Sequence, residues 1–297
     1  MFDSLYPTMQ WANHRHHWPL AAHSQFVQAG GIQWHVQIMG QGPALLLLHG
    51  TGSGSFSWRK LMPLLSTHFQ VIAPDLPGHA FTSRGTEGSL SLQGMSEGLR
   101  ALLLQLNVTP AILGGHSAGA AIAANMLLQQ RALSQSQLIG FNPAWLPLPG
   151  LPSLIFRPAA KLAAINPISA WATAKLASKP AMIEKSISQT GSHLDAEGLA
   201  LYQSVFSHSG HVHSVLNMMA AWQLNSLSSA LPQIKNAVAI LVGTQDQTVP
   251  PSMAHEACKL MPQARLYEQP NLGHLAHEED PAGTAQLIFK ICESRTL

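Results

Sequence analysis

The stretch LGGHSAGAAIAANMLLQQ, residues 113–130, decides the fold of this chain. It opens on the apolar end of a buried strand, continues with Gly-His-Ser-Ala-Gly at 115–119, and closes on a helix-forming run. A G-x-S-x-G turn between a strand and a helix is typical of a nucleophile elbow, which holds its serine in a strained backbone conformation. Gly115 and Gly119 fit this interpretation, because a Cβ atom at either place would collide with the adjoining strand or helix. Ser117 is therefore the candidate nucleophile, and a glycine-rich turn with a bystander serine is the alternative.

The composition indicates a compact, apolar protein. The chain has 297 residues, of which 46% are hydrophobic and 10% are charged, whereas about a quarter of an average soluble domain is charged. This length suits one large α/β domain or a core with an inserted subdomain. The formal net charge of +2 gives no reason to expect a nucleic-acid partner. Cys258 and Cys292 match neither a disulfide framework nor a metal-ligand spacing, and the first residues lack the features of a signal peptide, so a cytoplasmic location is expected.

Strand-like and helix-like segments alternate on both sides of the elbow. The expected strands are a hairpin over residues 25–40 that turns at Gly30-Gly31, and the segments 44–48, 69–75, 111–113, 137–141, 237–243 and 264–268. The expected helices are 91–107, 120–130, 252–261 and a C-terminal helix from about residue 281. Such alternation indicates a parallel sheet with right-handed crossovers. We therefore expect an α/β fold with a mostly parallel, eight-stranded sheet and helices on both faces.

Two segments lie outside this alternation. Residues 1–24 are irregular and contain four histidines, but no cysteine or carboxylate lies close by to complete a metal site, so we expect a loosely packed surface arm without metal. Residues 143–231 show no convincing strand and are bounded by proline clusters, which predicts an inserted helical cap. The helices expected there are 153–164, 168–178, 180–189, 196–207 and 212–225. The core then consists of residues 25–142 and 232–297.

Two strand ends supply what a serine nucleophile needs. A free serine hydroxyl is a poor nucleophile at neutral pH, so it requires a base that a carboxylate orients. Asp246 follows the strand 237–243, and His274 follows the next strand along the chain. Both lie at the carboxyl edge of a parallel sheet, where the elbow also lies. The chain order Ser117, Asp246, His274 matches the order that accompanies this type of elbow.

Other acids and bases fit these roles less well. Asp75 also follows a strand, but the chain order disfavours it as the acid. Asn142 follows another strand, and an amide cannot do the work of a carboxylate. His79, His116 and His277 are expected to be structural or surface groups rather than the base.

The segment His49-Gly50-Thr51-Gly52-Ser53-Gly54 follows the strand 44–48. Its three glycines suggest either a phosphate-binding loop or an oxyanion loop. The spacing fits neither G-x-x-x-x-G-K-[ST] nor G-x-G-x-x-G, so the elbow downstream favours the oxyanion loop. We predict that the backbone N–H groups of Thr51 and Ala118 form the oxyanion hole.

Over residues 25–297 the sequence resembles the α/β-hydrolase superfamily. More narrowly, it resembles the magnesium-chelatase accessory proteins of bacteriochlorophyll biosynthesis in the stretches GGIQWHVQIMGQGPALLLLHGTGSGSFSWRKLMPLL, VIAPDLPGH, GHSAGAAIA, GHVHSVLNMMAAW and LGHLAHEEDP. It departs at Ala80, because such proteins commonly have a second glycine after Pro-Gly-His. The resemblance implies an α/β-hydrolase fold, an acyl-enzyme mechanism without metal or organic cofactor, and a role beside the magnesium-chelatase subunits.

The cap is expected to select the substrate. The residues expected to contact it are Gly52, His116, Trp145, Trp171, Met218, Met219 and Trp222. These residues predict a large, adaptable apolar pocket. For about half of those that belong to the cap, burial in the cap's own core is an equally good interpretation. Two interpretations are open for His208, His211 and His213. They could ligate the magnesium of a pigment, but a cluster of histidines at the start of a helix is the favoured interpretation.

The charge pattern of the cap region adds a second clue. No Asp or Glu occurs between Glu97 and Glu184, while Arg and Lys occur six times. This excess of positive charge predicts contact with substrate carboxylates or with an anionic membrane surface. If the contact is with a membrane, we expect the protein at the periphery of the inner membrane. A tetrapyrrole, which is flat and apolar with carboxylate arms, fits both the resemblance and the cap.

Two classes of function remain open from the sequence. One is a serine hydrolase that acts on a bulky apolar ester. The other is a non-catalytic tetrapyrrole carrier or assembly factor on a hydrolase fold, since a fold does not determine a function.

Overall fold

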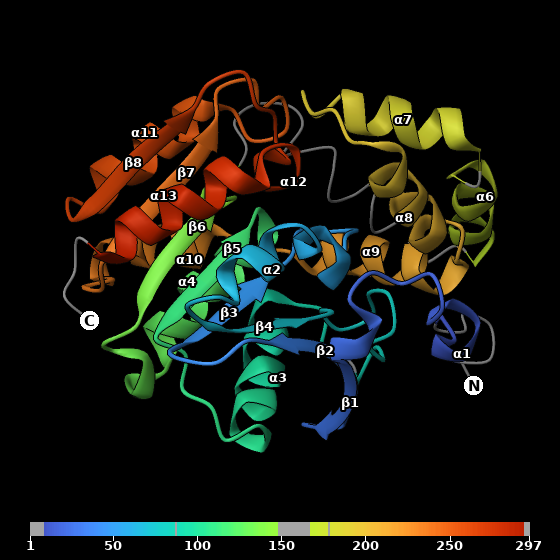
Figure 1. The fold of residues 1–297 in the computed structure, drawn as a ribbon, viewed down its shortest axis with the longest axis horizontal. Helices are drawn as coiled ribbons and strands as arrows, with labels where there is room; N and C mark the ends of the chain where they lie inside the picture. Colours follow the sequence, from blue (N-terminus) through green and yellow to red (C-terminus); the bar gives the residue numbers. More distant parts are fainter. Residues whose placement is uncertain (1–8, 87, 148–166, 178, 294–297) are drawn as a thin grey trace.

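The computed structural model describes residues 9–86, 88–147, 167–177 and 179–293. Its centre is an eight-stranded sheet with the strand order β1-β2-β4-β3-β5-β6-β7-β8 (Figure 1). The strands are β1 Ser24–Ala29, β2 Ile32–Met39, β3 Ala44–Leu48, β4 Gln70–Pro74, β5 Ile112–His116, β6 Gln137–Phe141, β7 Val238–Gly243 and β8 Ala264–Gln269. β2 pairs antiparallel with both β1 and β4, and every other pair of neighbours is parallel. The expected mostly parallel, eight-stranded sheet is confirmed.

The local sequence explains the strands. β5, β6 and β7 are buried along their whole length, as strands with a layer on both faces must be, and this is why they are nearly continuous apolar runs. The β1–β2 hairpin turns at Gly30 and Gly31, which adopt φ angles of 60° and 75°. Two successive positive φ angles are what a two-residue turn between antiparallel strands requires, and glycine adopts them without steric cost.

Helices cover both faces of the sheet (Figure 1). On one face, the core cluster includes residues of α3 Leu92–Gln105, α4 Ala118–Gln129 and α11 Pro251–Leu260. On the other face, it includes residues of α2 Leu61–Leu65 and α13 Pro281–Glu293. The side chain of Ser91 caps α3 by accepting a hydrogen bond from Gly94 N at 3.1 Å. The short helices η2 Ser55–Trp58, η3 Arg131–Leu133, η4 Leu231–Gln233 and α12 Ala276–Glu279 complete the core.

The segment expected to be the cap is helical where the structure describes it. Its helices are α6 Pro167–Ala177, α7 Pro180–Ser188, α8 Ala196–Phe206 and α9 Ser209–Ala221, which group together at one end of the molecule (Figure 1). The expected helix 153–164 lies outside the described residues. The expected helix 212–225 is broken where Trp222 adopts an extended conformation, and a separate helix, α10 Asn225–Ala230, follows. Because Leu227 of α10 is buried in the core cluster under α4, this last part of the segment belongs to the core.

The described part of the N-terminal arm, residues 9–24, differs from the expectation of a loose, irregular segment. It forms α1 Trp11–His14 and η1 Ala21–His23, and Trp18 is buried. The ring of Trp18 packs edge-on against Phe81 and Phe56, with centroid distances of 4.6 and 5.5 Å. Burial of large aromatic surface of this kind contributes a few kcal/mol, so the arm is fastened to the core.

Candidate active site

The backbone at residue 117 has the geometry of a nucleophile elbow. β5 ends at His116, α4 begins at Ala118, and Ser117 between them has φ 52° and ψ −114°. A Cβ atom added at Gly115 would collide with the backbone of Gly119, and one added at Gly119 would collide with the backbone of Leu48. Non-glycine residues with such φ angles store about 1–3 kcal/mol of strain, which the surrounding structure must hold.

Hydrogen bonds from β6 and the loop after it hold this turn. Ser117 N donates to the carbonyl of Phe141 at 3.0 Å, and the Ser117 carbonyl accepts from Ala120 N at 3.2 Å and Ala144 N at 3.1 Å. The end of β6 therefore fixes the strained peptide, and the Ser117 side chain is left half-buried at the carboxyl edge of the sheet.

Asp246 and His274 meet at the same edge. Asp246 Oδ2 accepts a hydrogen bond from His274 Nδ1 at 2.7 Å, and Asp246 Oδ1 accepts from the backbone N–H groups of Thr248 at 2.7 Å and Val249 at 2.8 Å. Both the acid and the imidazole are almost fully buried. The two backbone donors fix the orientation of the carboxylate, so its second oxygen faces His274. A proton held at Nδ1 leaves Nε2 as the acceptor, which is the tautomer that a general base needs.

Asn142 has a role that the sequence interpretation missed. Its Nδ2 donates to Asp246 Oδ2 at 2.7 Å, so the same carboxylate oxygen accepts from both Asn142 and His274. Asn142 adopts a left-handed φ of 44° at the end of β6, a conformation that asparagine tolerates better than most residues. The sequence places Asn142 at the correct edge of the sheet, but it gives no sign that the amide is a hydrogen-bond partner of the candidate acid.

The structure brings Ser117, His274 and Asp246 to one edge, but among these three described residues no hydrogen bond joins Ser117 Oγ to His274. Catalytic hydrogen bonds are often long or poorly aligned before substrate binds. The hydrogen bond between His274 and Asp246 is therefore formed in the free chain, while the one between Ser117 and His274 is not.

Two further histidines lie beneath the candidate base. The rings of His116 and His274 are 4.6 Å apart, and His116 Nε2 donates to the His274 carbonyl at 2.9 Å. His277 packs on His116 and on Trp58. Burial lowers the pKa of His277 to about 3 and that of His116 well below its usual value, so both are neutral. His116 is thus buried and in contact with the backbone of the candidate base, as expected of a structural group, and its predicted contact with substrate stays a prediction.

The predicted oxyanion loop runs past the elbow. A Cβ atom added at Gly50 would lie 3.3 Å from Ser117 Cβ, which places this part of the loop directly against the candidate nucleophile. Ala118 is the first residue of α4, and its N–H group therefore has no acceptor within the helix. The loop and the helix start are in the expected places, and the oxyanion role of Thr51 and Ala118 stays a prediction.

Several residues predicted to contact substrate lie at or near this loop. Met218 on α9 is buried, and its sulfur lies 3.8 Å from Thr51 Oγ1. Gly52 is buried with φ 78°, and the ring of Phe206 fills the space beside its Cα. Met219 is partly buried, while Trp222 is partly buried against the main core cluster.

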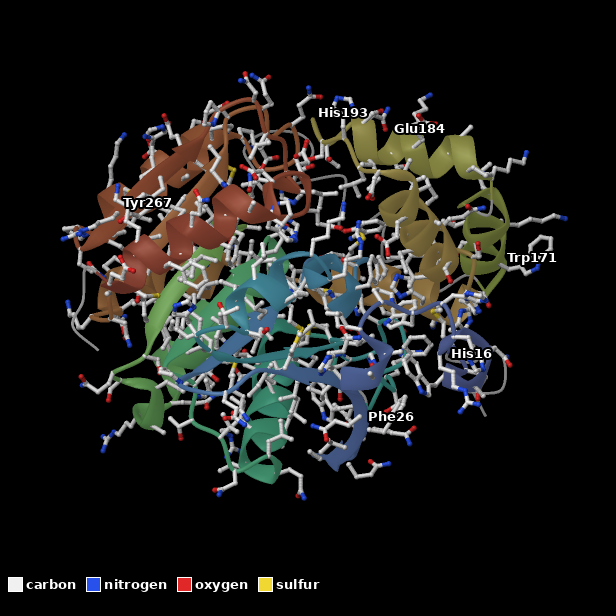
Figure 2. All side chains as sticks on the ribbon, viewed as in Figure 1. His16, Phe26, Trp171, Glu184, His193 and Tyr267 are labelled. Carbon is white, nitrogen blue, oxygen red and sulfur yellow. The ribbon has the colours of Figure 1, made fainter. Side chains whose placement is uncertain are left out.

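Trp145 and Trp171 are placed differently from the prediction of a pocket lining. Trp145 is 1% exposed within the core cluster, and its Nε1 donates to the Ala120 carbonyl at 2.8 Å, because the glycine at position 140 leaves room for the ring. Trp171 is 56% exposed and points outward from α6, where Lys175 Nζ lies 5.0 Å from its ring centroid (Figure 2). The first tryptophan is part of the core, and the second is a surface group.

Asp75 is structural, as the chain order indicates. It is fully buried, and its carboxylate binds His35 Nδ1 at 2.7 Å and the N–H groups of Ser55 at 2.6 Å and Phe81 at 3.2 Å. Burial alone would raise its pKa, but His35, His49 and the N–H group of Ser55 outweigh it and lower the pKa to about 2. Ala80, which stands where a second glycine is common, adopts a left-handed φ of 42°.

Metal ligation has no support in the residues that the structure describes. Within those ranges no group of three or more His, Cys, Asp or Glu side chains is placed to hold a metal ion. Of His208, His211 and His213, which the sequence offers as magnesium ligands, the first two have partners within the protein: His208 Nδ1 bonds the Ser204 carbonyl, and His211 Nε2 bonds the Gly52 carbonyl. In the same ranges every helix is too short or too polar to span a membrane.

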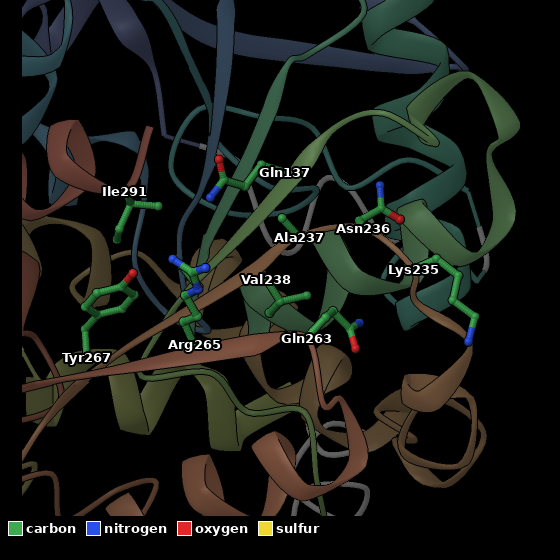
Figure 3. Close-up of a pocket in the computed structure, with 10 residues that line it drawn as sticks. Gln137, Lys235, Asn236, Ala237, Val238, Gln263, Arg265, Tyr267 and Ile291 are labelled. Carbon is green, nitrogen blue, oxygen red and sulfur yellow. The ribbon is translucent and has the colours of Figure 1, made fainter. Parts of the chain in front are cut away.

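A hollow of about 260 Å³ lies at the opposite edge of the sheet (Figure 3). Gln137, Val238 and Arg265, which line it, stand at the amino ends of β6, β7 and β8. Because the candidate triad lies at the carboxyl ends of the same strands, this hollow is separate from the candidate active site.

Comparison with known proteins gives the family. A sequence profile described as "alpha/beta hydrolase fold" matches residues 43–281. The chain belongs to the α/β-hydrolase family. It is 35% identical, over 92% of its length and 95% of the other, to a protein of Rhodobacter capsulatus named "Magnesium-chelatase 30 kDa subunit".

Solved structures show the same fold at lower identity. A putative lipase of Acinetobacter baumannii AYE aligns with a TM-score of 0.77 and 20% identity, over 97% of this chain and 98% of the other. The epoxide hydrolase CorEH aligns with a TM-score of 0.75 and 20% identity, over 92% and 99%. The α/β-hydrolase fold and the resemblance to a magnesium-chelatase protein, both expected from the sequence, are confirmed.

Proposed function

We propose that the protein is a serine hydrolase that acts on a bulky, apolar ester-type substrate in tetrapyrrole metabolism. The observation that carries the proposal is the 2.7 Å hydrogen bond from His274 Nδ1 to Asp246 at the sheet edge where Ser117 sits in a strained turn. A strained backbone at a serine lowers the stability of the folded protein. In a G-x-S-x-G elbow, this strain accompanies a serine that acts as the nucleophile.

In the proposed reaction, His274 Nε2 removes the proton of Ser117 as Oγ attacks the ester carbonyl. Asp246 stabilises the imidazolium that forms, while Asn142 and two backbone N–H groups hold Asp246 in place. The N–H groups of Ala118 and Thr51 hold the oxyanion, each contributing about 3–4 kcal/mol to the stability of the transition state. His274 then protonates the leaving alcohol, and water attacks the acyl-enzyme by the same steps in reverse.

The cap and the relative support the substrate class. Met218 and Phe206 bring apolar surface to the oxyanion loop. The similarity over nearly the whole chain to a protein named as a magnesium-chelatase subunit favours a tetrapyrrole ester. Magnesium-chelatase subunits are then expected partners. Contact with an anionic membrane surface through the basic cap remains a further expectation, to be tested by flotation with anionic and neutral vesicles.

A second candidate is a non-catalytic tetrapyrrole carrier or assembly factor on this fold. One observation favours it, which is the name of the relative. The candidates differ in whether the Ser117 hydroxyl is needed.

Complementation separates them. The host is a bacterium that makes bacteriochlorophyll and lacks its own related protein, and wild type and Ser117→Ala are expressed at equal levels. The hydrolase predicts rescue by the wild type and none by Ser117→Ala. Full rescue by Ser117→Ala would show that catalysis is dispensable and would establish the carrier.

A further inference from the structure

The cap holds three successive residues of the oxyanion loop. Thr51 Oγ1 lies 3.8 Å from the sulfur of Met218 on α9, and the Gly52 carbonyl lies 3.2 Å from His211 Nε2 on the same helix. Ser53 Oγ lies 3.1 Å from Tyr202 Oη on α8. Met218, His211, Ser53 and Tyr202 are all more than nine-tenths buried.

Within the loop, the backbone hydrogen bond from Ser53 N to the Gly50 carbonyl, at 3.2 Å, restrains only part of its conformation. Glycines at positions 50, 52 and 54 give a six-residue segment unusual backbone freedom. The core fixes the far end, where Ser55 N donates to Asp75 at 2.6 Å. Residues 51–53 lie between that anchor and β3, and the side chains that hold them belong to the cap.

His211 is held in one tautomer. Ala80 N donates to His211 Nδ1 at 3.1 Å, so Nδ1 is an acceptor and the ring proton is on Nε2. Nε2–H therefore donates to the Gly52 carbonyl. Burial lowers the pKa of His211 to about 3, which keeps the ring neutral and this donor–acceptor pair intact. Phe206 packs edge-on against His211 and fills the space at Gly52.

Tyr202 connects the oxyanion loop to the segment that carries the candidate base. Its hydroxyl donates to Glu278 Oε1 at 2.8 Å, so it accepts the hydrogen bond from Ser53 Oγ. Glu278 lies four residues after His274 in the chain and also binds Arg59 Nη1 at 2.5 Å. One cap side chain thus joins the two core loops that must act together on Ser117.

We propose that His211 and Tyr202 are positioning residues, which set the backbone of residues 51–53 so that the oxyanion hole is formed when the cap is seated on the core. The inference rests on the proposed serine-hydrolase function. Oxyanion donors act because they are fixed before the reaction, and a displacement of about 1 Å can reduce catalysis about 100-fold. The cap therefore controls the rate even for an ester too small to fill a pocket beneath it.

Three variants isolate the positioning contacts. Ser53→Ala removes the link between the loop and Tyr202 but keeps the link between Tyr202 and Glu278. His211→Phe removes both hydrogen bonds of the ring, and His211→Gln restores one donor and one acceptor. Lys60→Gln is the matched control, because it breaks an exposed ion pair between core and cap, Lys60–Asp195 at 2.6 Å, that does not touch the loop.

The readouts are kcat and KM for p-nitrophenyl acetate, and the affinity for phenylboronic acid, whose tetrahedral adduct on serine fills the oxyanion hole. We expect Ser53→Ala and His211→Phe to lower kcat about 10- to 100-fold with KM nearly unchanged, and to weaken boronate binding by a similar factor. His211→Gln should recover part of the loss, and Lys60→Gln should match the wild type. Thermal unfolding checks that each variant is folded.

The outcomes are distinguishable. If the wild type hydrolyses the ester, full kcat and boronate affinity in Ser53→Ala refute the positioning role of Tyr202, and the same result in His211→Phe refutes that of His211, while the hydrolase stands. If KM alone rises, the cap contacts serve binding and not the oxyanion hole, which also refutes it. If the wild type neither turns over the ester nor binds the boronate, the hydrolase itself fails and this inference falls with it.

Discussion

Replacing Asp246 with asparagine tests the role of the candidate acid most sharply. The two backbone N–H groups of Thr248 and Val249 will keep the amide oxygen, so the new NH2 group must occupy the place of Oδ2. There it faces His274 Nδ1, which can then accept and no longer donate. The ring proton moves to Nε2, and His274 cannot remove the proton of Ser117.

The expected loss follows from the tautomer change. Wrong-tautomer variants of this kind lose about 10⁴-fold in kcat, which corresponds to about 5.5 kcal/mol in the activation free energy. The NH2 group that Asp246→Asn introduces would also face the NH2 group of Asn142, which adds a repulsive donor–donor contact. In contrast, Asn142→Ala removes one of the hydrogen bonds to the carboxylate and should cost about 1 kcal/mol, or about 5- to 10-fold in kcat.

The assay is steady-state hydrolysis of a p-nitrophenyl ester, combined with ¹⁵N NMR of the imidazole of His274. Asp280→Asn is the matched control, because Asp280 Oδ1 accepts from Gly283 N at the start of α13, and an amide oxygen can do the same. The control should retain wild-type activity. If Asp246→Asn is folded and keeps more than about a tenth of wild-type kcat, the assignment of Asp246 as the acid is wrong.

Three further predictions concern stability. Burial holds the pKa values of His211 and His277 at about 3, so both are neutral in the folded protein but protonated below about pH 6.5 in the unfolded chain. Their contribution to the free energy of unfolding is therefore fully present above pH 6.5, and it should fall by up to about 3 kcal/mol per pH unit as the pH drops toward 3. A free energy of unfolding in urea that stays constant from pH 6.5 to 5 would contradict this. Asp75→Ala should destabilise the protein by about 3–5 kcal/mol in urea, because it leaves the buried donors of His35, Ser55 and Phe81 unpaired, and a loss below about 1 kcal/mol would refute that role. Ala80→Gly should raise stability by about 1 kcal/mol in thermal unfolding, since it relieves a left-handed φ of 42°, and a decrease would show that the position is unstrained.

Local patterns in the sequence predict most of the core. The hairpin at Gly30-Gly31, the apolar runs of the parallel strands and the elbow at Ser117 each carry a signal within a short stretch of sequence. The positions of Asp246 and His274 follow from one topological rule, that parallel strands end at the same edge. These are the features that tertiary context changes least.

The remaining differences come from contacts between segments far apart in the chain. The sequence predicts that Trp145 faces a pocket. Its ring is buried instead, because a glycine in β6 leaves space for it and a carbonyl in α4 accepts its hydrogen bond. The bridge from Ser53 through Tyr202 to Glu278 joins three segments with no shared motif. The sequence predicts a loose N-terminal arm and gives no sign that Trp18 is buried. The aromatic residues that bury it lie in distant segments of the chain. Spacing in the sequence carries no signal for such contacts.

The central claim is that Ser117 is an activated nucleophile, and covalent labelling tests it most directly. The protein is incubated with a fluorophosphonate probe, and the modified residue is located by mass spectrometry of tryptic peptides. The proposed function predicts one adduct on Ser117 in the wild type, and none in Ser117→Ala or His274→Ala. An unmodified wild type, under conditions in which a known serine hydrolase is fully labelled, would contradict it.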